Sequence, residues 1–150
     1  MHRQKTIFVF TRGFSSAGRA FEWHSKGQGF DSPNLHKILA MKIDVDINNS
    51  VTADLKSIFK SNLNKIILYG SYARGDESEE SDVDYLILTS LNDDEIKKYN
   101  KLIVDLSYKY LDKYNVLFSF VIINSNQFTK YSDALPFYNN IVKEGTVVYG

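Results

Sequence analysis

The chain has 150 residues, no formal net charge, 43% hydrophobic and 24% charged residues, and no cysteine. This length and composition fit one globular domain and exclude a disordered or fibrous protein. The lack of cysteine excludes disulfides, thiolate metal sites and a cysteine nucleophile. No apolar run approaches the roughly 18 residues of a membrane span, and the N-terminus lacks the pattern of a secretory signal. We therefore expect a cytoplasmic protein without a membrane partner.

The zero net charge hides an asymmetry along the chain. Residues 1–40 carry six basic and two acidic residues, whereas residues 41–150 carry twelve basic and sixteen acidic residues. All three histidines and the only tryptophan also precede residue 41. So abrupt a change predicts a boundary near residue 40. Nucleic acid is not an expected partner, because the acidic second part lacks the basic stripe that binds it.

The first forty residues admit two interpretations. Thr6–Thr11 could form a short strand, but residues 12–34 are rich in glycine and serine and have neither helical nor strand periodicity. One interpretation is a disordered basic arm. The other is that residues 1–40 are the conceptual translation of a transfer-RNA gene and do not belong to the native protein.

The second interpretation depends on the codons that the segment allows. Gly18–Ala20 can be encoded as GGT-AGA-GCA, which resembles a transfer-RNA D-loop, and Gly29–Ser32 as GGG-TTC-GAT-TCC, which resembles a TΨC arm. Gly18 and Phe30 are twelve codons apart, about the separation of these two elements in a transfer RNA. We therefore expect Met41 to be the true initiator and residues 41–150 to form the domain.

From residue 41 onward the pattern predicts regular elements. Lys42–Ile47 alternates in polarity and fits either a short strand or a loop, and Ser50 is predicted to cap a helix over Val51–Ser61. The further predicted elements are a strand over 65–69, an acidic loop over 70–81 with a helical turn near 72–74, a strand over 82–89, a helix capped by residue 92 or 93 and running to 114, a strand over 116–123, short helices from 125 and over 136–144, and a β segment over 146–149. This order indicates an α+β domain with a small mixed sheet and helices packed on it.

The stretch between the first two strands carries the chemistry. A buried strand ends at Gly70 and Ser71, ten residues follow, and Asp82 and Asp84 open the next strand. Gly70 has no Cβ and lets a phosphate approach the backbone, and Ser71 offers a hydroxyl and an N–H to an anion. Arg74 lies between the two elements and could reach a phosphate.

Two carboxylates two residues apart on a strand project from the same face. Asp82 and Asp84 therefore repel one another unless a cation lies between them, and Mg²⁺ takes one or two carboxylates and completes its shell with waters and substrate phosphates. The simpler alternatives are a Gly-Ser turn and a solvated acidic loop. Tyr72 and Tyr85 flank the motif and could stack on an adenine base.

The pattern GS-x10-DxD between two strands resembles the minimal nucleotidyltransferases of the DNA polymerase β superfamily. The resemblance covers roughly residues 41–150, including the third strand, the helix PFYNNIVKEG and the terminal VVY, and implies the polymerase β palm-like fold. It implies transfer of AMP from ATP, with Gly70 and Ser71 holding the triphosphate and Asp82 and Asp84 binding Mg²⁺. Members of this size are often antitoxins paired with a HEPN-domain toxin, and a tyrosine of that toxin often accepts the AMP.

The chain departs from the family in one respect. The superfamily usually places a third carboxylate on the next strand, where VLFSFVII offers only apolar residues and Ser119. Asp105, Asp112 and Asp133 lie on the predicted helix and in a later loop. The alternatives are therefore a slow adenylyltransferase, a degenerate fold that neutralises its partner by binding alone, and transfer to a small molecule such as an aminoglycoside, for which 110 residues leave little room.

Overall fold

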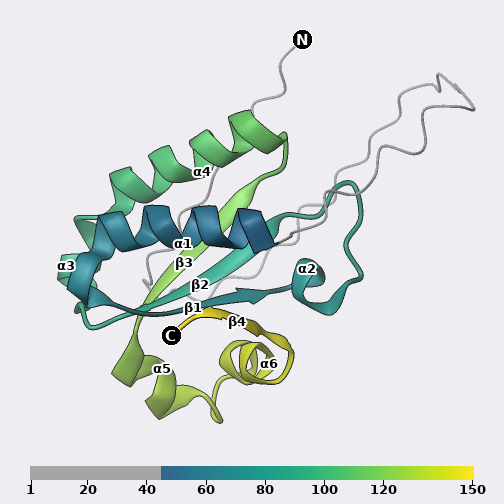
Figure 1. Cartoon of the computed structure of the whole chain (residues 1–150). Helices are drawn as coiled ribbons and strands as arrows, with labels where there is room; N and C mark the ends of the chain where they lie inside the picture. Colours follow the sequence, from purple (N-terminus) through teal and green to yellow (C-terminus); the bar gives the residue numbers. More distant parts are fainter. Residues whose placement is uncertain (1–44) are drawn as a thin grey trace, which may run out of the picture.

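The computed structural model describes residues 45–150, which form a four-stranded sheet with helices on both faces (Figure 1). The predicted strand at 6–11 and the boundary near residue 40 lie outside these residues. The elements in chain order are α1 (Val45–Phe59), the 3-10 turn η1 (Lys60–Asn62), β1 (Leu63–Tyr69), α2 (Ser71–Arg74), β2 (Val83–Thr89), α3 (Asp93–Lys97), α4 (Asn100–Tyr114), β3 (Phe118–Asn124), α5 (Ser125–Tyr131), α6 (Pro136–Glu144) and β4 (Thr146–Tyr149).

The sheet is mixed, with the strand order β3-β2-β1-β4. β1 pairs antiparallel with both β2 and β4, whereas β2 and β3 are parallel. The parallel pair requires a crossover, which α3 and α4 supply. The predicted α+β class and small mixed sheet are confirmed.

Each face of the sheet has its own apolar core because successive strand residues point to opposite faces. One core gathers side chains of α1 and α4 against residues such as Ile66, Tyr85 and Phe118. The other gathers α5 and α6 against Ile67 and Leu86. Figure 1 shows α1 and α4 on one side of the sheet and α5 and α6 on the other.

The first helix begins six residues earlier than the sequence pattern predicts. Its buried residues Ile47, Val51, Leu55 and Phe59 recur at every fourth position, so the helical period already includes part of the alternating segment 42–47. The prediction of a strand or loop is thus wrong for residues 45–47. Ser50 is not a cap: its hydroxyl donates to the carbonyl of Asp46 at 2.9 Å within the helix.

The single helix predicted up to residue 114 is two helices. Asn92 caps α3 in a capping box with Glu95. The amides of Lys98 and Tyr99 then bond three residues back, to Glu95 and Ile96, and this tighter turn separates α3 from α4. The Tyr99 ring there stacks on Phe59 at 4.9 Å. Within residues 45–150, no helix has the length and apolar character that crossing a membrane requires.

Candidate active site

The Gly-Ser turn lies where β1 ends and the single-turn helix α2 begins. Gly70 precedes α2 with φ 75° and ψ −157°, a backbone region that only glycine adopts readily. Its carbonyl accepts the amides of Ala73 and Arg74 at 3.2 Å. The helical turn predicted near 72–74 is therefore confirmed, and the amides at its start have no partner within the helix.

The turn and the carboxylate pair meet through Gly70 and Asp84. Tyr69 pairs with Asp84 in the antiparallel β1–β2 ladder, which brings the strand end carrying Gly70 beside the Asp84 side chain. A Cβ on Gly70 would lie 2.7 Å from Asp84 Oδ2. The absence of a side chain at Gly70 thus allows the Asp84 carboxylate to lie directly against the turn.

The two carboxylates differ in their surroundings. Asp82 precedes β2 and is exposed, whereas Asp84 is within β2 and half-buried. Burial, and secondarily the charge of Asp82, raise the pKa of Asp84 to about 6, and the Ser119 hydroxyl opposes this shift by donating to the carboxylate. An ionised Asp84 therefore carries an electrostatic cost that a cation would remove.

Ser119 is aligned with Asp84 across the parallel β2–β3 pair. Tyr69, Asp84 and Ser119 thus form one row across three strands, on the same face of the sheet. The sequence had singled out Ser119 only as the polar residue of a strand without an acid. The sequence alone does not predict its role as partner of Asp84, because the local sequence pattern does not determine the register between two strands that α3 and α4 separate.

Arg74, predicted to reach a phosphate, is engaged elsewhere. Its guanidinium contacts Asp76 at 3.1 Å and Glu144, at the end of α6, at 3.3 Å. All three side chains are largely exposed, so these ion pairs exchange readily with water and with other anions. The contact of Arg74 with a phosphate remains a prediction.

Arg74→Ala is expected to leave the melting temperature nearly unchanged, because its two ion pairs are exposed. If the guanidinium contacts the triphosphate, the substitution should weaken binding of Mg-ATP about tenfold, the usual effect of losing one charged hydrogen bond. Glu144→Gln is the matched control, since it frees Arg74 from a competing anion and should not weaken binding. Equal affinity of Arg74→Ala and the unaltered protein, measured by calorimetry, would exclude Arg74 from the site.

The two tyrosines proposed to stack on adenine differ in their accessibility. Tyr85 is fully buried among Phe118 and Phe120, and its hydroxyl donates to Asn48 at 2.8 Å. It faces α1, away from Asp84, so the prediction is wrong for Tyr85. Tyr72 is half-buried, and burial together with Glu77 and Asp82 raises its pKa. For Tyr72 the adenine contact stays a prediction.

The carboxylate pair suits a magnesium ion that shares its ligands with a substrate. Within residues 45–150, no group of three or more acidic, histidine or cysteine side chains is arranged to hold a metal. Asp82 and Asp84 are two hard oxygen donors, and the Asp84 carboxylate lies directly against the turn at Gly70. This donor set fits Mg²⁺, which binds by one or two carboxylates together with waters and substrate phosphates.

A glycine-serine turn against a carboxylate, where the inner strand β1 ends and the inner strand β2 begins, is the arrangement that the sequence analysis expects of a nucleotidyltransferase. The profile of the family described as "Polymerase beta, Nucleotidyltransferase" matches residues 53–150. The chain belongs to this family.

Two relatives from Methanocaldococcus jannaschii have similar sequences. "Putative protein adenylyltransferase MJ0604" is 39% identical over 95 residues, which cover 63% of this chain and 87% of the relative. "Putative protein adenylyltransferase MJ0141" is 36% identical over 94 residues, which cover 63% and 93%.

Two solved structures overlap the chain partly, each with a TM-score of 0.48 and coverage of 69% of this chain and 73% of the other. One, at 21% identity, is described as "Crystal structure of the toxin-antitoxin with AMP-PNP". The other, at 19% identity, is a mutant of the toxin-antitoxin MntA-HpeT.

Proposed function

We propose that the chain is a Mg²⁺-dependent nucleotidyltransferase that moves AMP from ATP to a hydroxyl of a protein partner. The observation that carries the proposal is the close approach of the Asp84 carboxylate to the Gly70 turn, which supports a phosphate site at the turn next to a metal site at the carboxylates. The name of the two M. jannaschii relatives, protein adenylyltransferase, supports the choice of acceptor class.

Each residue of the proposed site would have its own role in the reaction. The backbone at Gly70 and the amide and hydroxyl of Ser71 would orient the β- and γ-phosphates. Asp82 and Asp84 would hold Mg²⁺, which when bound neutralises charge on the phosphates. The acceptor oxygen forms a bond to the α-phosphorus, the bond to the bridging oxygen breaks, pyrophosphate leaves, and the hydroxyl proton passes to water.

The biological role belongs to the same proposal. The family resemblance points to a HEPN-domain toxin as the acceptor, so that the chain acts as an antitoxin. A cytoplasmic location, where ATP and Mg²⁺ are abundant, fits this role. The experiment for the partner is transfer of labelled AMP to a purified HEPN-domain protein from the same organism, and a gene for such a protein beside the one for this chain would favour the proposal.

The alternative function is neutralisation of the partner by binding alone. The observation in its favour is Ser119, which aligns with Asp84 where a third carboxylate would be placed on the neighbouring strand. Loss of a general base typically slows a reaction by about 10²–10⁴-fold. A modification that is needed once per partner molecule tolerates such a rate, so we favour the slow enzyme.

Binding of Mg-ATP should stabilise the protein against heat. ATP at about 100 times its dissociation constant adds roughly 2.7 kcal/mol to the free energy of unfolding, which raises Tm by several degrees. The rise should require Mg²⁺ and should be absent from the double variant Asp82→Asn/Asp84→Asn. An equal rise in the double variant would show that ATP binds elsewhere, and no rise in either protein would favour the binding-only alternative.

A further inference from the structure

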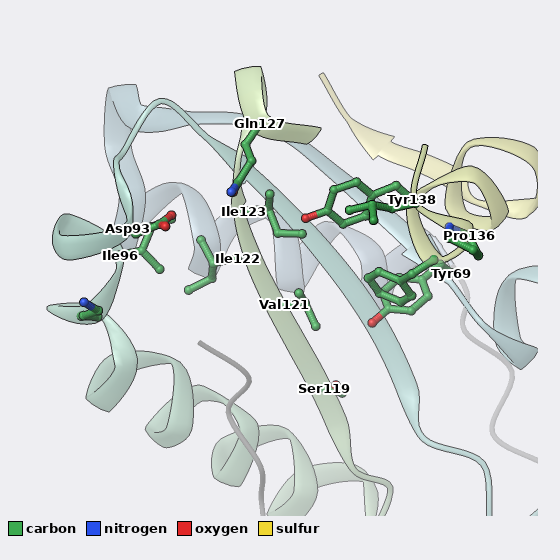
Figure 2. Close-up of a pocket in the computed structure, with 13 residues that line it drawn as sticks. Tyr69, Asp93, Ile96, Ser119, Val121, Ile122, Ile123, Gln127, Pro136 and Tyr138 are labelled. Carbon is green, nitrogen blue, oxygen red and sulfur yellow. The ribbon is translucent and has the colours of Figure 1, made fainter. Parts of the chain in front are cut away.

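A groove of about 520 Å³ runs along the outer strand β3 and ends beside the proposed reaction centre. Ser119 lies at the end nearest Asp84, and Val121 and Ile123 continue the groove toward α5. Figure 2 shows Ile96 of α3 on one side of β3, and Tyr69 and Tyr138 on the other. The groove is thus continuous with the row of residues that carries Asp84.

The strand that forms the floor of the groove has an open edge. Among residues 45–150, β3 pairs with β2 alone and is the last strand of the sheet on that side. The backbone groups on its outer side are therefore a template for a further strand. The groove beside this edge has a largely apolar lining, and Phe137 at the start of α6 is 46% exposed.

The position of the groove relative to the phosphates indicates which reactant enters it. The proposed triphosphate site at Gly70 and Ser71 follows β1, on one side of Asp84, whereas Ser119 lies on β3, on the other side. In an in-line displacement the attacking oxygen approaches the phosphorus opposite the leaving group. The acceptor should therefore arrive from the side of Ser119, through the groove.

We propose that the groove binds an extended segment of the acceptor protein, which adds a strand to β3 and presents its hydroxyl beside Ser119. Alternate apolar side chains of this segment would fill the groove over Val121 and Ile123. The groove floor from Ser119 to Ile123 spans five residues, about 16 Å of extended chain. The net negative charge of residues 41–150 favours basic residues on the opposite face of the segment. This inference rests on the proposed function.

The test uses the full chain, labelled ATP, Mg²⁺ and a synthetic heptapeptide of alternating valine and lysine that ends in tyrosine. The comparison peptide has the same sequence with methylated backbone amides, so it cannot donate hydrogen bonds to β3. Two variants alter the groove, Val121→Glu and Phe137→Ser. Val147→Glu is the matched control, because Val147 lies exposed on β4, the other edge of the sheet. The melting temperature of every variant is measured in parallel.

We expect transfer to the unmethylated peptide to fall about tenfold or more in both groove variants, as for the loss of a central contact in an interface. The control should stay within about twofold, and the methylated peptide should be labelled at least about tenfold more slowly. Phe137→Ser keeps the test decisive if Val121→Glu, which alters a half-buried position, unfolds the protein.

Two results would overturn the inference and leave the nucleotide site intact. The first is transfer that depends on Asp84 but is indifferent to the groove variants and to methylation. The second is a Mg-ATP-dependent rise in melting temperature without labelling of the peptide. If the rise in melting temperature is also missing, the proposed function fails, and the inference fails with it.

Discussion

Asp84→Asn is expected to stabilise the ligand-free protein while strongly reducing nucleotidyl transfer. Burial and the charge of Asp82 raise the pKa of Asp84 from its ordinary value to about 6 in the folded protein, so its ionisation opposes folding. Below the unfolded pKa near 4, Asp84 is protonated in both states, and the unaltered protein and the variant should be about equally stable. The unaltered protein then loses stability relative to the variant as the pH rises through about 6. Above pH 7 the variant should be more stable by about 1–2 kcal/mol, since solvent still reaches part of the carboxylate and screens it.

The same substitution removes an oxygen of the proposed metal site. Because a bound metal ion contributes several kcal/mol to transition-state stabilisation, transfer should fall by about 10³-fold. Unfolding by urea between pH 4 and pH 8, together with labelled-AMP transfer, measures both effects. Asp112→Asn, an exposed carboxylate on α4, should change neither. A variant that is less stable than the unaltered protein at pH 8 would show that Asp84 has a structural rather than a ligand-binding role.

Such a pair of effects is what distinguishes a binding site from a structural ion pair. A carboxylate that supports the fold has a basic partner, which lowers its pKa. Asp84 has instead a second carboxylate as neighbour and one hydroxyl, from Ser119, as its hydrogen-bond donor. At neutral pH a bound cation would remove this cost to the fold, so binding at the proposed site would raise the stability of the protein.

The sequence predicts that Gly70 and Asp84 come together better than it predicts what surrounds them. Gly70, Ser71, Asp82 and Asp84 are local features of two strand ends, and the constraint that joins them is short, ten residues of loop. The alternation of strand residues places Asp84 on one face and Tyr85 on the other. The same rule, applied to Tyr85, would have excluded it from the nucleotide site.

Features that depend on distant segments are not accessible to such reasoning. The alignment of Ser119 with Asp84 requires the register of two strands that α3 and α4 separate. The groove along β3 requires the positions of α5 and α6. The start of α1 was missed for a different reason: residues 42–47 satisfy the strand period, and only the packing of Ile47 against the core decides for the helix.

Gly70→Ala should damage both stability and nucleotide binding, because two independent constraints meet at this residue. Its φ of 75° with ψ of −157° costs a non-glycine residue about 1–3 kcal/mol. In addition, the new Cβ would lie 2.7 Å from Asp84 Oδ2, so the carboxylate has to move. We expect a loss of about 2–4 kcal/mol in the free energy of unfolding and at least about tenfold weaker Mg-ATP binding.

Gly75→Ala separates the two constraints. Gly75 ends α2 with the same φ of 75°, but a Cβ there meets no atom within 4 Å. This variant should lose only about 1 kcal/mol and should bind Mg-ATP normally. In Gly70→Ala/Asp84→Ala the clash is relieved while the backbone strain remains, so its free energy of unfolding should exceed that of Gly70→Ala. If Gly70→Ala resembles Gly75→Ala in both measurements, the close approach of Asp84 to the turn is not what organises the site, and the carboxylates would have to meet the phosphates from another direction.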